Sequence, residues 1–303
     1  MAMNRAQFKK QLQAGLNAVF GLEYRRHPER WRLYMDVETE NQKSYVEDVM
    51  MAGFGAAATK AEGAGVTYAT TSETYTARYI FETVALAFAI TEEAEEDNLY
   101  GSIGARLSKA LARSMQHTKA VKNADVINNG YSASYLGGDG VCLFSASHPV
   151  KMGGNQSNTF ATQADLMESS IEDMLINIST ALDDQGIPVA LTALRLCIPP
   201  QLKFPAHRIL RSELQADSAE NNINALRDMG AISGGYVVDE RFTDPDSWSI
   251  KTDCPDGLKH IVRKTVTKKV EGDWETGNMR YKSRERYIQG WSNWRGAYGS
   301  SGI

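Results

Sequence analysis

The sequence predicts an α+β fold in which one very long helix backs an extended sheet. Three observations carry this prediction. Apolar residues recur at helical spacing over residues 91–129, and strand-like alternation appears at 84–90 and again at 260–289. Between them, residues 150–256 alternate helix and strand patterns, as a compact α/β domain does. We therefore expect a discontinuous sheet domain beside a continuous α/β domain.

Composition excludes several classes of protein. The chain has 303 residues and a formal net charge of −4, which gives no sign of a nucleic-acid surface. No apolar run is long enough to cross a bilayer, and the amino end lacks the apolar core of a signal peptide, so we expect an intracellular protein with no membrane partner. Its three cysteines are odd in number and far apart, which favours reduced thiols.

The amino-terminal segment 1–52 is expected to be an arm. Residues 1–20 have the apolar stripe of a short amphipathic helix. Residues 31–52 mix aromatic and charged side chains without clear periodicity. Such a segment has no core of its own, so the arm is expected to lie on a partner surface.

Residues 53–80 predict a projecting hairpin. This segment is rich in glycine, alanine and threonine, and two strand-like runs, Val66–Ala69 and Tyr75–Phe81, flank the turn sequence Thr70–Glu73. A two-stranded hairpin with so little apolar content cannot bury a core. We therefore expect it to extend from the body.

The long helix has clear start and stop signals. Thr91 is a good N-cap, five carboxylates follow within Glu92–Asp97, and Asn128, Asn129 and Gly130 form a stop. At ~1.5 Å per residue the helix would span on the order of 58 Å. Gly101 and Gly104 weaken its start, and a bend is expected there.

The remaining elements follow from local patterns. A buried strand at 194–198 ends at two prolines, and a plain β pattern runs from 260 to the aromatic carboxyl end. We expect the strands at 81–90 and 257–298 to share one sheet packed on the long helix. The other predicted helices are 163–183, 206–214 and 217–229, and the other strands are 234–238 and 248–250.

No catalytic or metal-binding constellation emerges from the residues. Cys142, Ser147 and His148 resemble a nucleophile beside a base, yet no Gly-x-Ser-x-Gly elbow and no third member accompany them. The run Gly55–Lys60 lacks the glycine and hydroxyl residues of a phosphate loop. The acidic run Glu92–Asp97 is explained by the helix dipole, and the five histidines show no metal-ligand spacing. We expect no cofactor.

Four stretches taken together resemble the major capsid proteins of tailed phages with the Hong Kong 97-type fold, most closely the Mu-like major head subunits. They are the Thr/Tyr hairpin passing through Tyr75–Thr91 into the acidic run, the helix end at Asn123–Gly130, the motif Leu143–Pro149, and Leu194–Pro200 followed by a helix. The carboxyl end Gly290–Gly299 adds to the resemblance.

The resemblance implies names for the parts of the chain. These are an N-terminal arm (1–52), an extended loop (53–80), a peripheral domain with the spine helix (81–149 and 257–303), and an axial domain (150–256). It implies a structural, non-enzymatic subunit that assembles into hexamers and pentamers of an icosahedral shell around the phage genome. The virion capsid is the expected location, with assembly in the host cytoplasm.

The same resemblance implies partners. They are other copies of the chain, a portal protein, a decoration protein in some cases, and packaged double-stranded DNA in non-specific contact. About fifty residues precede the loop, too few for a scaffolding domain, so a separate scaffolding protein is expected. The expected subunit-interface residues are Lys60, Glu62, Thr67, Tyr68, Tyr75 and Arg78.

Two alternatives stay open at this point. One is another head or tail component of a phage, such as a tube protein. The other, from a different class, is a hydrolase that uses Cys142 or Ser147 with His148.

Overall fold

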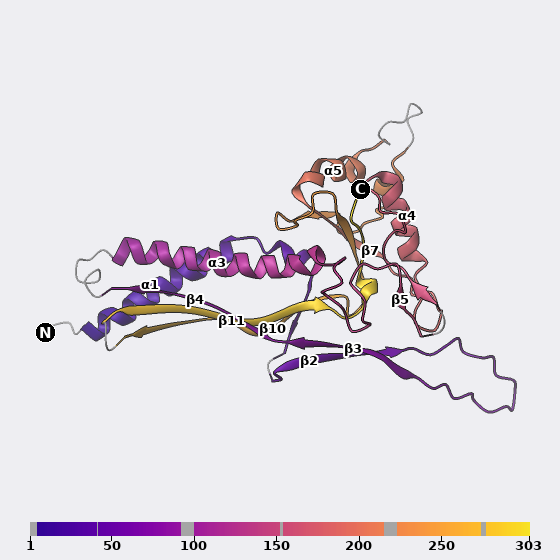
Figure 1. Cartoon of the computed structure of the whole chain (residues 1–303), viewed down its shortest axis with the longest axis horizontal. Coiled ribbons are helices and arrows are strands. Elements are labelled where there is room, and N and C mark those ends of the chain that lie inside the picture. Colours follow the sequence, from indigo (N-terminus) through magenta and orange to yellow (C-terminus); the bar gives the residue numbers. More distant parts are fainter. Residues whose placement is uncertain (1–4, 41, 92–99, 152–153, 215–222, 274–276) are drawn as a thin grey trace.

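The computed structural model describes residues 5–40, 42–91, 100–151, 154–214, 223–273 and 277–303. The chain forms an elongated lobe, a compact lobe at one end of it, and a hairpin that projects away from both (Figure 1). Two four-stranded sheets organise the lobes, and their strand orders are β1-β10-β11-β4 and β12-β9-β7-β8. The predicted α+β fold class is confirmed.

The elongated lobe contains the first sheet and two helices. Helices α1 and α3 pack against each other and cover one face of the sheet (Figure 1). The bounds are α1 Arg5–Arg26, α3 Tyr100–Asn128, β1 Asp36–Thr39, β4 Glu82–Ile90, β10 Leu258–Gly272 and β11 Met279–Trp291. The prediction that the strands near 84–90 and 260–289 share a sheet is confirmed by the antiparallel pairing of β11 with both β10 and β4.

Alternation along β11 decides which face meets the helices. Tyr281 and Met279 are buried in one cluster with Leu16 and Phe20 of α1 and Leu111 of α3. The intervening residues are exposed or half-buried on the opposite face, and they include Arg280, Lys282, Arg284 and Arg286. This period of two is the pattern of a sheet with one covered face and one open face.

The predicted start of the long helix falls in residues that the structure does not describe. Thr91 lies outside any helix, residues 92–99 lie outside the described residues, and α3 begins at Tyr100. From there the helix is continuous through Gly101 and Gly104, so residues 100–104 show no break, while Asn98 and the residue after it lie outside the described residues. A Cβ on Gly104 would lie 3.4 Å from side chains of both Ile90 and Leu16. Gly104 therefore marks close packing of α3 on β4 and α1 rather than a bend.

The projecting hairpin pairs β2, Tyr45–Ala52, with β3, Ser72–Ile80, in antiparallel register from Tyr45↔Ile80 to Ala52↔Ser72. The predicted first strand, Val66–Ala69, is wrong, because residues 53–71 contain no strand. The true first strand lies in the segment assigned to the arm. Its eight residues form a stem of seven paired positions, whereas a four-residue strand beside Thr70–Glu73 would form only a short ladder.

The rest of the arm has its partner surface within this chain. Trp31, Tyr34 and Met35, in and after the 3₁₀ turn η1 (Arg30–Leu33), are buried in the main hydrophobic cluster. β1 pairs in parallel with β10. The surface on which these residues lie therefore belongs to their own chain and not to a neighbouring copy, and the aromatic side chains fill the junction of the two lobes.

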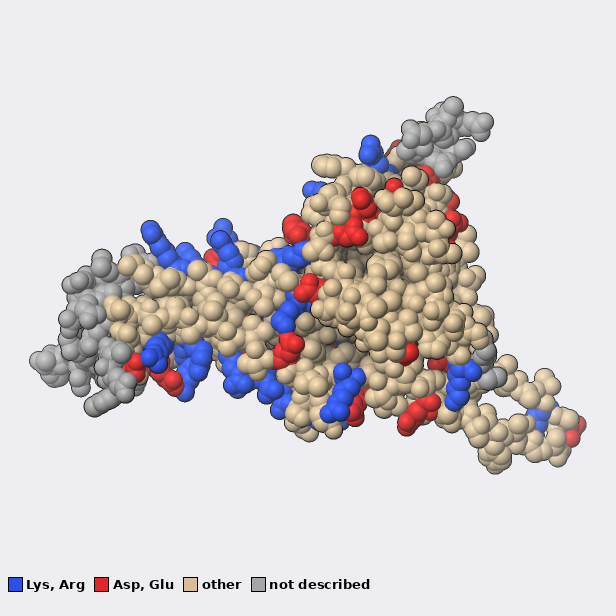
Figure 2. All heavy atoms as spheres, viewed as in Figure 1, with Lys and Arg blue, Asp and Glu red and all other residues tan. Residues whose placement is uncertain are grey.

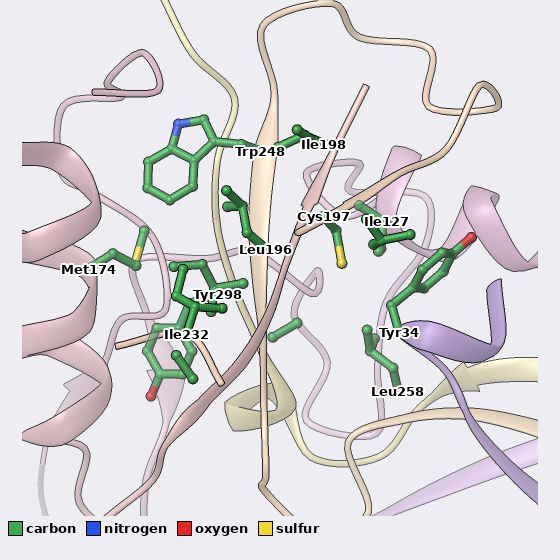
Figure 3. Packing of buried hydrophobic residues seen from close by; sticks show 14 of the residues in the cluster. Tyr34, Ile127, Met174, Leu196, Cys197, Ile198, Ile232, Trp248, Leu258 and Tyr298 are labelled. Carbon is green, nitrogen blue, oxygen red and sulfur yellow. The ribbon is translucent and has the colours of Figure 1, made fainter. Parts of the chain in front are cut away.

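The compact lobe is built around β7, a buried central strand. Figure 3 shows Leu196, Trp248 and Met174 on one side of β7, and Cys197, Ile127 and Tyr34 on the other. The bounds are β5 His148–Pro149, β6 Asn155–Gln156, α4 Glu168–Ser179, β7 Ala193–Ile198, η2 Pro200–Leu202, α5 Lys203–Arg211, α6 Ala225–Asp228, β8 Tyr236–Val238, β9 Trp248–Thr252, η3 Trp294–Gly296 and β12 Ala297–Ser300.

Two predictions for this lobe need correction. β12 pairs with β9, so the last strand belongs to this sheet and not to the long one. The buried amide of Asn158 holds it there by donating to the carbonyl oxygens of Leu143, at 2.6 Å, and Ala297, at 2.9 Å. Of the predicted helix 217–229, residues 217–222 lie outside the described residues, and within 223–229 the helix is α6.

Candidate subunit interface

The tip of the hairpin, residues 53–71, is here called the projecting loop. It extends beyond the body, and its surface is almost entirely uncharged (Figures 1 and 2). Of the predicted interface residues, Lys60, Glu62, Thr67 and Tyr68 lie on it, and all four are exposed. Tyr68 is 94% exposed.

The projecting loop exposes apolar side chains with nothing of its own to cover them. Phe54 is 59% exposed and Val66 is 68% exposed, while their neighbours are mostly glycine, alanine and threonine. Small side chains allow a backbone to lie close to another surface. Covering the large exposed apolar side chains with that surface would stabilise the contact. This segment has the character of a docking element.

Tyr75 and Arg78 lie in the stem of the hairpin and not on the projecting loop. Tyr75 is half-buried, and burial raises the pKa of its phenol. The Arg78 guanidinium lies 4.5 Å from the ring centroid of Tyr45 and 3.6 Å from the carboxylate of Glu47, both on the paired strand. The structure therefore separates the predicted set into four residues on the loop and two in the stem, of which Arg78 contacts the paired strand.

A buried lysine fixes the stem to the elongated lobe. Lys259 of β10 is 3% exposed, and its Nζ lies 2.7 Å from Asp48 Oδ2 of β2, 2.6 Å from Asp256 Oδ1 and 3.1 Å from Glu38 Oε1 of β1. Burial lowers the pKa of Lys259, but the hydrogen bonds to the carboxylates outweigh burial and raise it above its ordinary value. Sequence reasoning missed this cluster, because its members come from three distant segments, around residues 38, 48 and 256–259, and show no common motif.

Close backbone packing also holds the stem. A Cβ on Gly138 would lie 2.9 Å from backbone atoms of Thr76 and Ala77 in β3, so only glycine permits this approach. The neighbouring surface holds an open cavity of about 370 Å³ between the stem, α3 and β11. The Gly-rich run near 137–140 was visible in the sequence, but its partner strand was not.

The candidate hydrolase residues do not form a reactive site. His148 is fully buried, its ring stacks on Trp294 at 4.5 Å, and its Nδ1 lies 2.7 Å from Asp139 Oδ2. Burial raises the pKa of the Cys142 thiol, which is the opposite of what a thiolate nucleophile requires. The Ser147 backbone N–H donates to Ser145 Oγ, which caps the loop. These residues are structural.

Within the described parts of the chain, no group of three or more His, Cys, Asp or Glu side chains is placed to hold a metal ion. No described helix combines the length and the apolar character that crossing a bilayer demands.

The sequence matches the family described as phage capsid protein over residues 74–300. The chain therefore belongs to this family. Its match begins within β3 and ends at the last residue of β12, so it includes the compact lobe and most of the elongated lobe, and it excludes α1, β1 and the projecting loop. Membership of a capsid protein family gives the chain a structural role and not an enzymatic one. Curated proteins include no match to this sequence.

Solved structures share the fold at low sequence identity. A virus-like particle from Pyrococcus furiosus aligns with a TM-score of 0.54 and 12% identity over 94% of this chain and 97% of that chain. An encapsulin complex from Synechococcus elongatus PCC 7942 aligns with a TM-score of 0.54 and 8% identity, over 91% of this chain and 88% of that chain. The mature capsid of bacteriophage PhiM1 aligns with a TM-score of 0.52 and 12% identity, over 89% of this chain and 85% of that chain. The fold is therefore of the Hong Kong 97 type.

Proposed function

We propose that this chain is a major capsid subunit that assembles through hexamers and pentamers into an icosahedral shell around a packaged phage genome. The observation that carries the proposal is the projecting loop. It exposes Phe54, Val66 and Tyr68 on a segment that no other described part of the chain covers. Large apolar side chains on an extended segment indicate burial against another molecule, and in a shell that molecule is a neighbouring copy.

The proposal assigns a role to each lobe. The elongated lobe corresponds to a peripheral domain (81–149 and 257–303) and the compact lobe to an axial domain (150–256) near the symmetry axes, with 1–52 as arm and 53–80 as loop. Because β12 pairs with β9, residues 297–300 belong with the compact lobe in this scheme.

Relationship to the Mu-like head subunits is part of this proposal. So are a separate scaffolding protein, a portal protein, a decoration protein and non-specific contact with double-stranded DNA. Assembly would take place in the host cytoplasm. The bases are the family match over 74–300 and the sequence motifs at Tyr75–Thr91 and Leu143–Pro149.

The test removes the projecting loop and keeps the stem. Ala52 and Ser72 are directly paired, so residues 53–71 can be replaced by Asn-Gly, the preferred turn of a two-residue hairpin. We expect the shortened chain to keep its thermal transition and to lose assembly in electron microscopy and light scattering.

The unaltered chain, with any scaffolding partner supplied, is the control and should form capsomers or shells. Two results would contradict the proposal: a control that stays monomeric at all concentrations and salt levels, or a shortened chain that still forms complete shells. Open tubes in place of shells would support the tube-protein alternative.

A further inference from the structure

Two sides of the compact lobe carry opposite charge. Helix α5 has three cationic residues and no carboxylate, whereas α4 has three carboxylates and no lysine or arginine. Figure 1 shows the two helices on opposite sides of this lobe, with β7 between them. We call the two surfaces the α5 flank and the α4 flank.

The α5 flank carries one large exposed aromatic side chain and three exposed cationic side chains. Phe204 is 72% exposed, and Lys203 Nζ lies 5.9 Å from its ring centroid. Arg208 and Arg211 lie on the same helix and are exposed. Among the described residues, none of these three cations has a carboxylate within 4.0 Å. An exposed Phe ring on a helix that also carries three cations is suited to insertion into an apolar groove with an acidic edge.

The α4 flank has such a groove. An open cavity of about 550 Å³ lies between α4 and α6, lined mainly by apolar side chains. Ile176 is 61% exposed and Met229 is 79% exposed at this surface. Glu172 lines the groove, and the next residue, Asp173, is also exposed.

We propose that the α5 flank of one copy docks on the α4 flank of the next copy, with Phe204 entering the groove beside Ile176 and Met229. This inference rests on the proposed function, because it names the surfaces that close the capsomer ring. Opposite charges make the contact head-to-tail, since two α5 flanks or two α4 flanks would repel each other. A head-to-tail contact between different surfaces produces rings, whereas a contact of one surface with itself produces only dimers.

The position of the hairpin agrees with a neighbouring copy that lies on the α4 flank. The projecting loop extends on the side of the molecule that carries α4, while the elongated lobe extends on the side of α5 (Figure 1). A neighbour that docks its α5 flank on α4 therefore places its own body on the side that the projecting loop reaches. One neighbour can cover both the groove and the exposed side chains of the loop.

Charge reversal tests the pairing in the full-length chain. One variant carries Arg208→Glu and Arg211→Glu, and the other carries Glu172→Lys and Asp173→Lys. Each variant alone should lower the yield of rings and shells by about tenfold or more, because like charges then face each other across the contact. A chain carrying all four substitutions should recover assembly, since the charges are exchanged between flanks.

An equimolar mixture of the two variants gives the sharpest readout. Each contact is again between opposite charges only when the two variants alternate around the ring. Alternation is possible in six-membered rings and impossible in five-membered ones, so the mixture should form hexamers and open sheets but no closed shells. A merely structural effect of the substitutions would not distinguish even from odd rings.

The matched control is Arg106→Glu with Lys109→Glu, which makes the same charge change on exposed positions of α3. It should form rings normally. Two results would overturn the flank pairing while leaving the capsid function in place. One is that both flank variants assemble as well as the unaltered chain. The other is that the chain with all four substitutions folds but does not recover assembly. If the unaltered chain forms no rings, both proposals fail together.

Discussion

The segments 31–39 and 53–71 look alike in one respect from the sequence, since neither has a periodic apolar face, yet the structure treats them in opposite ways. Trp31 and Tyr34 are 1% and 0% exposed in the core of their own chain, whereas Tyr68 is 94% exposed. The difference teaches that aperiodic aromatics fill a junction between lobes when their neighbours are charged and bulky. When their neighbours are glycine and alanine, the aromatic side chains stay exposed to solvent.

The largest test of this contrast is Trp31→Ala. The side chain packs on the ring of His260 at 4.4 Å, and its removal leaves a cavity between the lobes. We expect a loss of about 3–5 kcal/mol in the free energy of unfolding, measured by denaturant titration. Trp31→Phe is the matched control, because it keeps an aromatic ring and removes an indole N–H that has no hydrogen-bond partner in the described structure. Equal stability of Trp31→Ala and the unaltered chain would show that segment 31–39 is not part of the core.

The pH dependence of stability gives a second, smaller test at the same place. Burial, together with the nearby cations Lys119 and Arg32, lowers the pKa of His260 from 6.5 to about 3. Between these values the unfolded chain binds a proton that the folded chain does not. Stability attributable to His260 is therefore full above about pH 6.5 and is lost as the pH falls toward 3, by at most about 1.4 kcal/mol per pH unit.

The measurement is the free energy of unfolding from pH 7 to pH 4, compared between the unaltered chain and His260→Gln. Glutamine does not titrate, so its stability curve should be flatter across this range. Parallel curves would mean that the Trp31–His260 junction opens to water before it is protonated.

The smallest effect on folding is expected for Tyr68→Ala with Val66→Ala in the projecting loop. Both side chains are exposed, so the free energy of unfolding should stay within about 0.5 kcal/mol. Assembly, followed by light scattering, should require a higher protein concentration. Ala58→Ser, at an exposed position of the same loop, is the control and should change neither property. A substantial loss of stability would place the loop in the core with segment 31–39.

Several elements followed from the sequence because their signals are local. The pairing of β4 with the β10–β11 hairpin and the end of α3 at Asn128 agree with alternation, helical spacing and the Asn-Asn-Gly stop. Four of the six predicted interface residues lie exposed on the projecting loop because small polar residues form no core. The motifs from Tyr75 to Gly299 also indicated the capsid family, which the match over 74–300 confirms.

The remaining features depend on contacts between distant segments. β2 pairs with β3 because Lys259, Asp48 and Ser292 meet at the base of the stem, and the Ser292 hydroxyl donates to Asp48 at 2.6 Å. The last strand joins the compact lobe through Asn158, 139 positions from Ala297. No local pattern encodes such pairs, since lysine, aspartate, serine and asparagine are also common at exposed positions.

The sequence by itself determined the α+β class, the long helix with its acidic preceding run, and the projecting segment, because each depends on the periodicity or composition of neighbouring residues. Only the tertiary structure decided which segments are covered and which are open. It placed the arm's aromatics in the core, left the projecting loop bare, and put the cations of α5 and the carboxylates of α4 on opposite sides of one lobe. Those outcomes depend on which distant surfaces meet, and a surface is defined only after the chain has folded.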